Sequence, residues 1–381
     1  MNRQHFPTSW RVVPFLEVVS DKTGGNPRIR QREYQDNGRL PVIDQGQKDV
    51  AGYVDDMSLR CKAPLPCVIF GDHTKVLKFV ETPFAIGADG VKVLVPSREL
   101  NPRYLFHYLK QIRFPKDTGY SRHFKFLKEA PIPVPPLDTQ KRIVDALDKA
   151  QELINKRKQQ IEMLDEFLQS VFLDMFGDPF KNTKQWATGT IRDVVSNVKY
   201  GTSKKAKTKD GQYPILRMNN ITYSGAWDFT DLKYIDLEEN ELEQYLVRSG
   251  DILFNRTNSR ELVGKTAVYR QNYPMAYAGY LIRVRANDKA NPEFIAAYLN
   301  TRYGKLVLEH MCRNIIGMAN INAQELQDIK IYIPPIILQD EFARIVKTTN
   351  AQKQLLESGL LEMHNAFNSI MQRAFKGELF N

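Results

Sequence analysis

Long apolar runs and paired cysteines are both missing from this chain of 381 residues. No stretch of about eighteen apolar residues could cross a membrane as a helix. The first residues lack the apolar core of a signal peptide, so we expect no such segment. The 3 cysteines are an odd number without zinc-type spacing, which disfavours a disulfide framework and a zinc site. These absences predict a reduced, cytoplasmic protein.

Sequence motifs for chemistry on nucleic acids are also missing. We find no Asn-Pro-Pro-aromatic motif of a methyltransferase, no nuclease cluster and no helicase motif. Gly264-Lys265-Thr266 imitates the end of a phosphate-binding loop, but Ser259 replaces the required earlier glycine, and the segment lies between two strand-like runs. We interpret it as a hairpin loop. Asp72-His73-Thr74 lacks a second His/Asp cluster, which favours a polar recognition loop or a structural turn over a metal site or a catalytic base. The chain is therefore predicted to bind without a catalytic residue, cofactor or metal of its own.

An internal repeat is the most informative feature that the sequence does contain. The pattern Pro-Pro-x-x-x-Gln occurs at residues 135–140 and again at 334–339, and the offset of 199 then holds for about forty residues. Earlier matches follow Trp10 and Trp186 at an offset of 176, and Asn101 and Asn291 at an offset of 190. The growing offset predicts insertions in the globular part of the second copy. Two equivalent modules in one chain predict a pseudo-two-fold protein that binds a target with two similar halves.

The net charge of +10 is distributed unevenly along the sequence. Residues 1–137 carry +7 and residues 179–336 carry +6, whereas residues 138–178 carry −3 and residues 337–381 carry 0. The excess positive charge thus lies in the two globular modules. Basic charge segregated in this way is typical of nucleic-acid binding.

The segments that follow the two modules are predicted to be long helices. From Ile143 to Met175, apolar residues recur at spacings of four and three, and the same pattern returns from Phe342 to Ala374. Gly177 and Gly377 are expected to end the two helices. Two helices of matched length in one chain most simply pair with each other as an antiparallel coiled coil.

Short runs of β-forming residues broken by turns predict a mixed α/β fold for each module. Strands are expected at residues 67–70, 91–95, 251–254 and 280–284, and helices after Asn101-Pro102 and Asn291-Pro292. Polar and basic loops flank these strands and supply the candidates for contact with DNA, because Arg matches guanine, Asn or Gln matches adenine, and Lys mostly binds phosphate. In the first module the candidates are Arg28, Arg30, Arg32, His73, Lys75, Arg122 and Lys125, and in the second they are Thr202, Lys204, Lys205, Lys207, Arg217, Asn219, Arg256, Asn258 and Arg260.

Several of these motifs together resemble the specificity subunit of type I restriction-modification enzymes, over essentially the whole chain. The resemblance rests on the paired Pro-Pro-x-x-x-Gln helix starts, the Trp-x4-[Phe/Ile]-x-[Glu/Asp]-Val-Val openings, and residues 256–259 with 262–265. Residues 71–74 and 84–90 resemble one recurrent class of target recognition domain in that family.

The resemblance implies that residues 1–137 and 179–336 are target recognition domains and that residues 138–178 and 337–381 are helical spacers. Each domain would read one half of a bipartite DNA site, in a pseudo-two-fold arrangement joined by the two long antiparallel helices. It further implies assembly with two modification subunits and two restriction subunits. Those partners would hold S-adenosylmethionine, ATP and Mg, methylate adenine, and translocate and cleave DNA.

Two other functions are compatible with the residues. One is a stand-alone bivalent DNA-binding architectural protein without a catalytic partner. The other is a scaffolding coiled coil whose basic modules bind acidic proteins. Co-purification with a methyltransferase separates the first interpretation from both, and loss of binding to a duplex of the wrong sequence separates a reader from an architectural binder.

Overall fold

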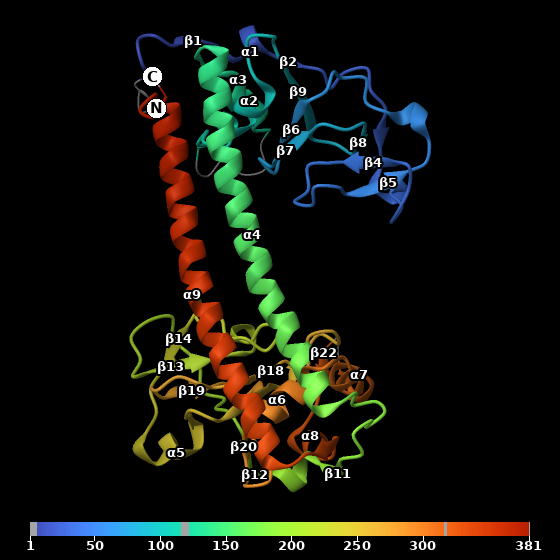
Figure 1. The fold of residues 1–381 in the computed structure, drawn as a ribbon, viewed down its shortest axis with the longest axis vertical. Helices are drawn as coiled ribbons and strands as arrows, with labels where there is room; N and C mark the ends of the chain where they lie inside the picture. Colours follow the sequence, from blue (N-terminus) through green and yellow to red (C-terminus); the bar gives the residue numbers. More distant parts are fainter. Residues whose placement is uncertain (1–5, 116–121, 316–317, 381) are drawn as a thin grey trace. The chain divides into compact units, whose positions relative to one another are not determined.

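The computed structural model describes residues 6–115, 122–315 and 318–380, and of residues 313–315 only the backbone. The chain divides into two compact units. Unit 1 comprises Met1–Lys158 with Ser358–Asn381, and unit 2 comprises Gln159–Glu357. Each unit therefore contains one globular module and a segment of each of the two long helices (Figure 1).

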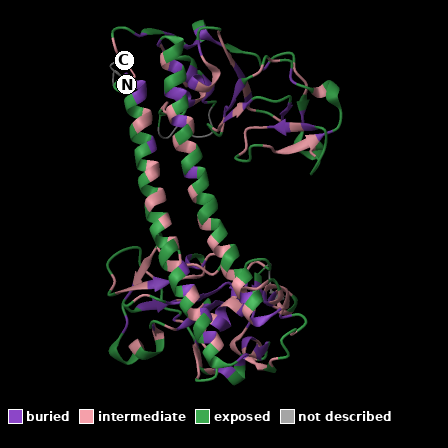
Figure 2. Cartoon of the chain, in the orientation of Figure 1, coloured by how far each residue is buried: buried purple, intermediate pink, exposed green. Residues whose placement is uncertain are grey.

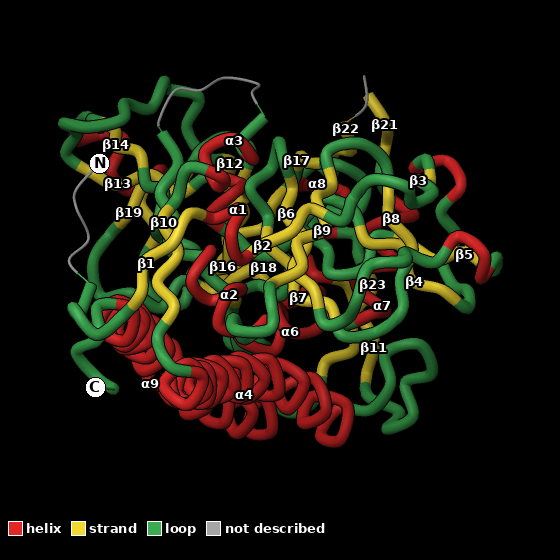
Figure 3. The backbone as a smooth tube through the Cα atoms, turned by 90° about the horizontal axis from the view of Figure 1, so that it is seen from above, coloured by secondary structure: helices red, strands yellow, loops and turns green. Residues whose placement is uncertain are grey.

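Two four-stranded sheets form the core of unit 1. The strands of the first are β2 (Val19–Asp21), β9 (Val91–Pro96), β6 (Cys67–Gly71) and β7 (Leu77–Val80), in that order. The strands of the second are β3 (Arg28–Ile29), β8 (Ala85–Gly87), β4 (Leu40–Ile43) and β5 (Gly52–Val54). Both views place the second sheet on the side of the module away from the helices (Figures 1 and 3).

The central strand of the first sheet is buried on both faces. Val68 and Phe70 pack into the cluster that holds the helices, and Cys67 and Ile69 pack into the cluster shared with the second sheet. Alternate side chains of a strand point to opposite faces, so a run of apolar residues is needed for a strand buried on both sides. The remaining elements of unit 1 are β1 (Arg11–Pro14), α1 (Phe15–Val18), η1 (Gln31–Glu33), η2 (Met57–Leu59), α2 (Pro102–Leu109), α3 (Phe124–Lys128) and β10 (Pro131–Val134).

Unit 2 has the same plan. Its first sheet runs in the order β12 (Val195–Tyr200), β20 (Leu281–Ala286), β16 (Ile252–Asn255) and β18 (Thr266–Val268). Its second sheet runs in the order β14 (Lys233–Ile235), β13 (Tyr213–Leu216), β19 (Met275–Tyr277) and β15 (Leu246–Val247). The other elements are β11 (Ala187–Thr190), η3 (Ile191–Val194), η4 (Met218–Asn220), η5 (Glu239–Glu241), α5 (Leu242–Tyr245), β17 (Thr257–Asn258), α6 (Pro292–Asn300), α7 (Arg302–Met311), β21 (Arg313–Ile315), β22 (Met318–Asn320), α8 (Ala323–Gln327) and β23 (Lys330–Ile333).

The two modules share the topology of their first sheets and of three strands of their second sheets, which confirms the duplication inferred from the repeat. The fourth strand of the second sheet differs, because β3 runs parallel to β8 whereas β15 runs antiparallel to β19. β6 pairs with β7 and β9 in the first module as β16 pairs with β18 and β20 in the second. In the second sheets, β4 runs parallel to β8 and antiparallel to β5, as β13 runs parallel to β19 and antiparallel to β14. The predicted insertions are present in the second copy, where β17, α7, β21 and β22 have no counterparts in the described part of the first.

The two long helices are α4 (Leu137–Phe176) and α9 (Ile336–Phe375), each of 40 residues. Gly177 and Gly377 follow them with positive φ angles of 81° and 72°, as expected for glycines that end helices. The predicted strands and the helices capped by Asn101 and Asn291 are confirmed as well.

The glutamine of each Pro-Pro-x-x-x-Gln repeat joins its module to its helix. Gln140 is fully buried. Its side chain accepts a hydrogen bond from the backbone N–H of Asn101 (2.7 Å) and donates to the backbone carbonyl oxygens of Glu99 and Pro135. Gln339 is also fully buried and makes the equivalent three bonds, to Asn291, Lys289 and Pro334. A glutamine side chain has an oxygen that accepts and an NH2 group that donates hydrogen bonds. One side chain therefore satisfies both the backbone N–H of the residue that caps α2 or α6 and two backbone carbonyl groups.

Within each unit the segments of α4 and α9 pack antiparallel. In unit 2, Phe172 contacts Phe342 with ring centroids 5.6 Å apart, and Asp165 pairs with Lys353 at 2.6 Å. In unit 1, Arg142 lies over Phe380, just beyond α9, and Arg157 lies beside Gly359. Residue numbers thus rise along one helix as they fall along the other. Lys353 is a charged residue within the apolar pattern of α9, and its ion pair with Asp165 accounts for it.

The prediction of the seam missed the most buried residues near the end of α4. Buried positions of α4 lie in its first half, up to Ile154, and again near its end, whereas residues 155–171 are intermediate or exposed (Figure 2). Phe172 and Phe176 are 2% and 0% exposed, whereas Val171 and Met175, expected in the seam, are only partly buried. The physical reason is that this end of the helix contacts α6 as well as α9, since both phenylalanines also pack against Phe294.

We predict that Gln140→Ala loosens the joint of the first module alone. The change removes three buried hydrogen bonds and leaves an amide and two carbonyl groups without partners, which costs about 2 kcal/mol. Residue-resolved hydrogen exchange should show faster exchange of the Asn101 amide and unchanged exchange of the Asn291 amide. Gln339→Ala is the matched control and should show the reverse. Equal acceleration of both amides in either variant would contradict a local joint.

Candidate nucleic-acid interface

Some candidate residues of each module directly follow the central strand of the first sheet: His73 and Lys75 follow β6, and Arg256, Asn258 and Arg260 follow β16. Val68 of β6 pairs with β9 as Ile252 of β16 pairs with β20, so Asp72 and Arg256 occupy equivalent positions just after the strand. The Asp72 carbonyl accepts a hydrogen bond from the backbone N–H of His123 (2.8 Å), and the Arg256 carbonyl accepts one from Ile321 (2.9 Å). In each module the end of the strand is thereby tied to the segment that precedes α3 or α8.

In the first module this tie brings together loops far apart in the sequence. Asp72 is buried, and its carboxylate accepts a hydrogen bond from the Phe124 amide at 2.7 Å. The interpretation of Asp72 as part of a structural turn is therefore supported. His73 is half-buried, and its backbone N–H donates a hydrogen bond to the side-chain oxygen of Gln45. Lys75 is exposed, with its ammonium 5.5 Å from the centre of the Phe114 ring.

Candidates on other segments of the first module are exposed. Arg122 and Lys125 flank the start of α3, beside the loop of Asp72. Residues 120 and 121 of the same loop lie outside the described residues. Arg28, Arg30 and Arg32 lie on β3 and η1 of the second sheet, and Arg28 pairs with Asp89 at 3.3 Å. Gln45 connects this sheet to the end of β6, since its side chain bonds both the Asp89 carbonyl and the His73 amide.

In the second module, Arg256 is held firmly by its backbone. Its N–H donates to the Tyr280 carbonyl at 3.0 Å, and its own carbonyl receives the Ile321 bond. The guanidinium lies over the ring of Tyr200, 4.9 Å from the ring centre. Asn258, two residues on, is half-buried in β17, which pairs with β22.

Most other basic candidates of the second module are neutralised by carboxylates. Lys204 pairs with Glu241, Lys207 with Asp236 at 2.6 Å, Arg217 with Asp231 at 2.8 Å and Arg260 with Glu309 at 3.2 Å. The hydrogen bond to Glu241 raises the pKa of Lys204, and the hydrogen bond from Arg217 lowers the pKa of Asp231. These acids were missed by the sequence prediction. For Asp236 and Glu241 the available signal was the acidic run of residues 236–243, which contains five carboxylates, whereas Asp231 and Glu309 lie outside it.

The remaining candidates of the second module differ in exposure. Lys205 and Asn219 are exposed, whereas Thr202 is 4% exposed and its hydroxyl oxygen accepts a hydrogen bond from the Lys204 amide. The buried position of Thr202 places its neighbours, rather than its own side chain, at the surface of the loop. Lys265, in the imitation of a phosphate loop, is also buried, and its ammonium donates to the carbonyl oxygens of Met218 and Ile221. Thr266 begins a strand and not a helix, so the hairpin interpretation of that segment is confirmed.

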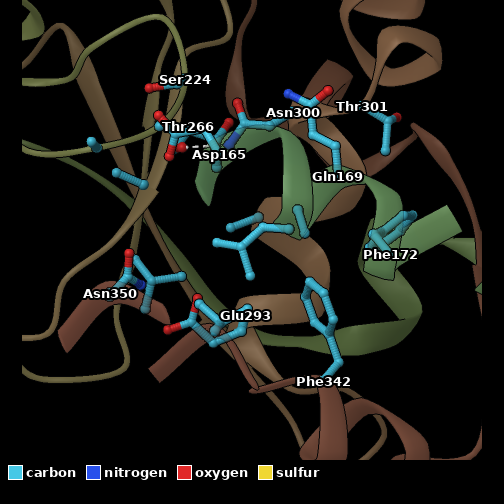
Figure 4. Close-up of a pocket in the computed structure, with 18 of the residues that line it drawn as sticks. Asp165, Gln169, Phe172, Ser224, Thr266, Glu293, Asn300, Thr301, Phe342 and Asn350 are labelled. Carbon is cyan, nitrogen blue, oxygen red and sulfur yellow. Dashed lines mark hydrogen bonds between the residues drawn. The ribbon is translucent and has the colours of Figure 1, made fainter. Parts of the chain in front are cut away.

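A separate hollow of about 1070 Å³ lies in unit 2 between the helix segments, α6 and the loop of residues 223–227. Its wall is mixed: Phe172 and Phe342 are apolar, and Asn300 donates a hydrogen bond to the Thr266 carbonyl at 2.8 Å (Figure 4). Glu293, also on this wall, is paired with Arg270. None of the sequence-predicted DNA-contact residues lines it.

Within residues 6–115, 122–315 and 318–380, no group of three or more His, Cys, Asp or Glu side chains is arranged to hold a metal ion. Nor does any helix in those ranges combine the length and apolar character needed to cross a membrane.

Known proteins with similar sequences include specificity subunits of type I restriction enzymes. The chain is 26% identical over 65% of its length to the EcoKI specificity subunit of Escherichia coli (strain K12), an alignment that covers 57% of that protein and so less than two thirds of it. It is 23% identical over its whole length to the StySPI specificity subunit of Salmonella potsdam, 91% of which is covered.

Solved structures with this fold include an S subunit of a type I restriction-modification system from M. genitalium. The match covers 98% of the chain and 97% of that structure, with a TM-score of 0.56 and 15% sequence identity. A structure from a study of assembly of the type I R-M system gives a TM-score of 0.57 over 98% of the chain and 99% of that structure, with 18% identity. At such identities the likeness concerns the fold.

The family of type I restriction modification DNA specificity domains matches the chain twice, at residues 7–163 and 183–362. Each match spans one of the two modules and much of the long helix that follows it. The duplicated sequence, the shared topology and this double match lead to one conclusion: the chain belongs to the family of type I restriction-modification DNA specificity proteins.

Proposed function

We propose that this chain is the DNA-recognition subunit of a type I restriction-modification complex. The observation that carries the proposal is the equivalence of the two modules: each presents cationic side chains just after the same central strand. Two similar readers on one chain fit a DNA site made of two half-sequences. The fifteen candidate residues other than the buried Thr202 are proposed to supply the contacts, with base-edge contacts giving specificity and phosphate contacts giving affinity.

The proposed roles of the segments follow the boundaries expected from the sequence. Residues 1–137 and 179–336 act as target recognition domains, and residues 138–178 and 337–381 act as spacers. The spacers form an antiparallel coiled coil that relates the domains by a pseudo-two-fold axis and sets the distance between half-sites. The antiparallel contacts inside each unit support this arrangement.

The chemistry is proposed to lie on partner subunits. Two modification subunits would bind S-adenosylmethionine and methylate adenine, and two restriction subunits would use ATP and Mg to translocate and cleave DNA. The chain itself would be non-catalytic and would work in the cytoplasm, where its DNA lies.

A first prediction is that the purified chain transfers no methyl group. Incubation with S-adenosylmethionine labelled in its methyl group and with host DNA lacking this modification should leave the DNA unlabelled. Addition of the purified modification subunit should restore labelling at adenine. Labelling by the chain alone would contradict the non-catalytic role.

A second prediction concerns the independence of the modules. Replacing residues 179–336 with the corresponding segment of another family member should change one half of the methylated sequence and preserve the other. The measurement is methylation mapping of a host that carries the chimera and the modification subunit. The reciprocal exchange of residues 1–137 is the matched control. A change in both halves after either exchange would count against separate readers.

A third prediction treats the helices as a ruler. Inserting seven residues into each helix near the level of Arg157 and Gly359 preserves the heptad seam and adds about 10 Å. That length corresponds to about three base pairs at roughly 3.4 Å per pair. We expect the same half-sequences with a spacer longer by a few base pairs, and lower affinity if the new rotation requires DNA to twist. Methylation mapping gives the spacer, and an unchanged spacer at full affinity would contradict the ruler.

A further inference from the structure

The basic candidates of the second module differ in whether their charge is already engaged. Lys204, Lys207, Arg217 and Arg260 each have a carboxylate partner. The guanidinium of Arg256 makes no ion pair or hydrogen bond to any residue that the structure describes, and its Nε is buried without a partner. A paired cation must give up a carboxylate before it can bind DNA. Arg256 has no such bond to give up.

The side chain that holds this guanidinium is Tyr200, at the end of β12. Its ring lies under the guanidinium at 4.9 Å, and it is 41% exposed, so it is accessible from solvent. Because an aromatic face attracts a cation without using its N–H donors, the guanidinium keeps its hydrogen-bonding capacity.

Tyr200 is itself fixed at both ends. Its backbone pairs with Ile282 of β20, and its carbonyl accepts a hydrogen bond from the Tyr277 hydroxyl at 3.3 Å. Its own hydroxyl accepts a bond from the backbone N–H of Ala323, the first residue of α8, at 2.8 Å. The same segment before α8 anchors the Arg256 carbonyl through Ile321. The ring of Tyr200 and the backbone of Arg256 are therefore both hydrogen-bonded to the same short segment, residues 321–323.

We propose that Tyr200 is a positioning residue that holds Arg256 for contact with the edge of a guanine in the second half-site. This inference rests on the proposed function. Arginine matches guanine because its two parallel N–H donors reach the O6 and N7 acceptors in the major groove. A guanidinium held in place before binding loses less side-chain freedom when it makes that contact. The paired cations, by contrast, stabilise the loops around this site.

The test is a set of binding measurements on the full chain with its modification subunit. The probes are a duplex that carries the methylated sequence and a scrambled duplex, compared at one salt concentration. Arg256→Ala should weaken binding to the specific duplex by about 10- to 100-fold and leave the scrambled duplex nearly unchanged. Tyr200→Leu should cause about a tenfold loss on the specific duplex, and almost no further loss when Arg256→Ala is already present. Tyr200→Phe, which keeps the ring, should stay within about threefold of the unchanged protein.

Matched controls separate positioning from general damage. Tyr273→Leu removes a tyrosine of similar exposure, 45%, and Arg192→Ala removes an arginine of the same module that pairs with Asp328 and is not a candidate for contact with DNA. Both variants should bind the specific duplex nearly as well as the unchanged protein. Thermal unfolding checks that every variant is folded. If Tyr200→Leu fails to fold, Tyr200→Phe still decides, because a loss as large as that of Arg256→Ala would overturn the role of the ring. Equal losses from Tyr200→Leu with and without Arg256 would also overturn it.

The base assignment has its own readout. Replacing each guanine of the second half-site in turn by 7-deazaguanine removes its N7 acceptor. One replacement should weaken binding of the unchanged protein and have no effect on Arg256→Ala, and the absence of any such position would overturn the guanine contact. If the unchanged protein binds the specific and scrambled duplexes equally, the proposed function fails. If it discriminates but Tyr200→Leu binds as tightly as the unchanged protein, only the positioning inference fails.

Discussion

Two buried glutamines, Gln140 and Gln339, govern how each module is attached to its helix. Each uses a single amide to bond the start of α2 or α6, the chain before it, and the proline-rich entry to α4 or α9. Buried polar groups are costly when unpaired, so this geometry is strongly preferred over alternatives that leave any of the three groups unsatisfied. The loop that follows β6 or β16 therefore has a fixed direction relative to the helix segment in its own unit. A subunit that places two readers needs such a joint, because a loosely attached module would not hold a constant half-site position.

The electrostatics of the second module show that net charge is a coarse guide to where DNA is read. Residues 179–336 carry +6, yet four of the basic candidates there are already paired with carboxylates of the same unit. The positive field that remains attracts DNA over a long range. Under the proposed function, discrimination among sequences would depend instead on the few side chains that are unpaired and held in place. In the first module the equivalent loop presents Lys75 beside the ring of Phe114, and Lys75 makes no ion pair with a carboxylate in the described part of the chain.

The sequence allowed good prediction of features that depend on local chemistry. The long helices and their glycine ends, the caps at Asn101 and Asn291, and the strands around Val68 and Leu253 all follow from periodicity, capping preferences and runs of β-forming residues. The features that were missed depend on partners distant in the chain. Arg217 meets Asp231 and Arg260 meets Glu309 only after folding, and Phe172 is buried because α6 reaches it from residue 294. The pairing of Tyr200 with Arg256, 56 positions apart, has the same origin, since β12 and β16 both pair with β20.

The central claim is that one chain supplies the sequence specificity for a bipartite DNA site. Its most direct test is methylome sequencing of a host with and without this chain, in a background that retains the modification subunit. The account predicts a methylated-adenine motif that consists of two short defined sequences separated by a fixed number of unspecified bases, present only when the chain is expressed. A single continuous motif, or an unchanged methylome after deletion of the chain, would contradict it.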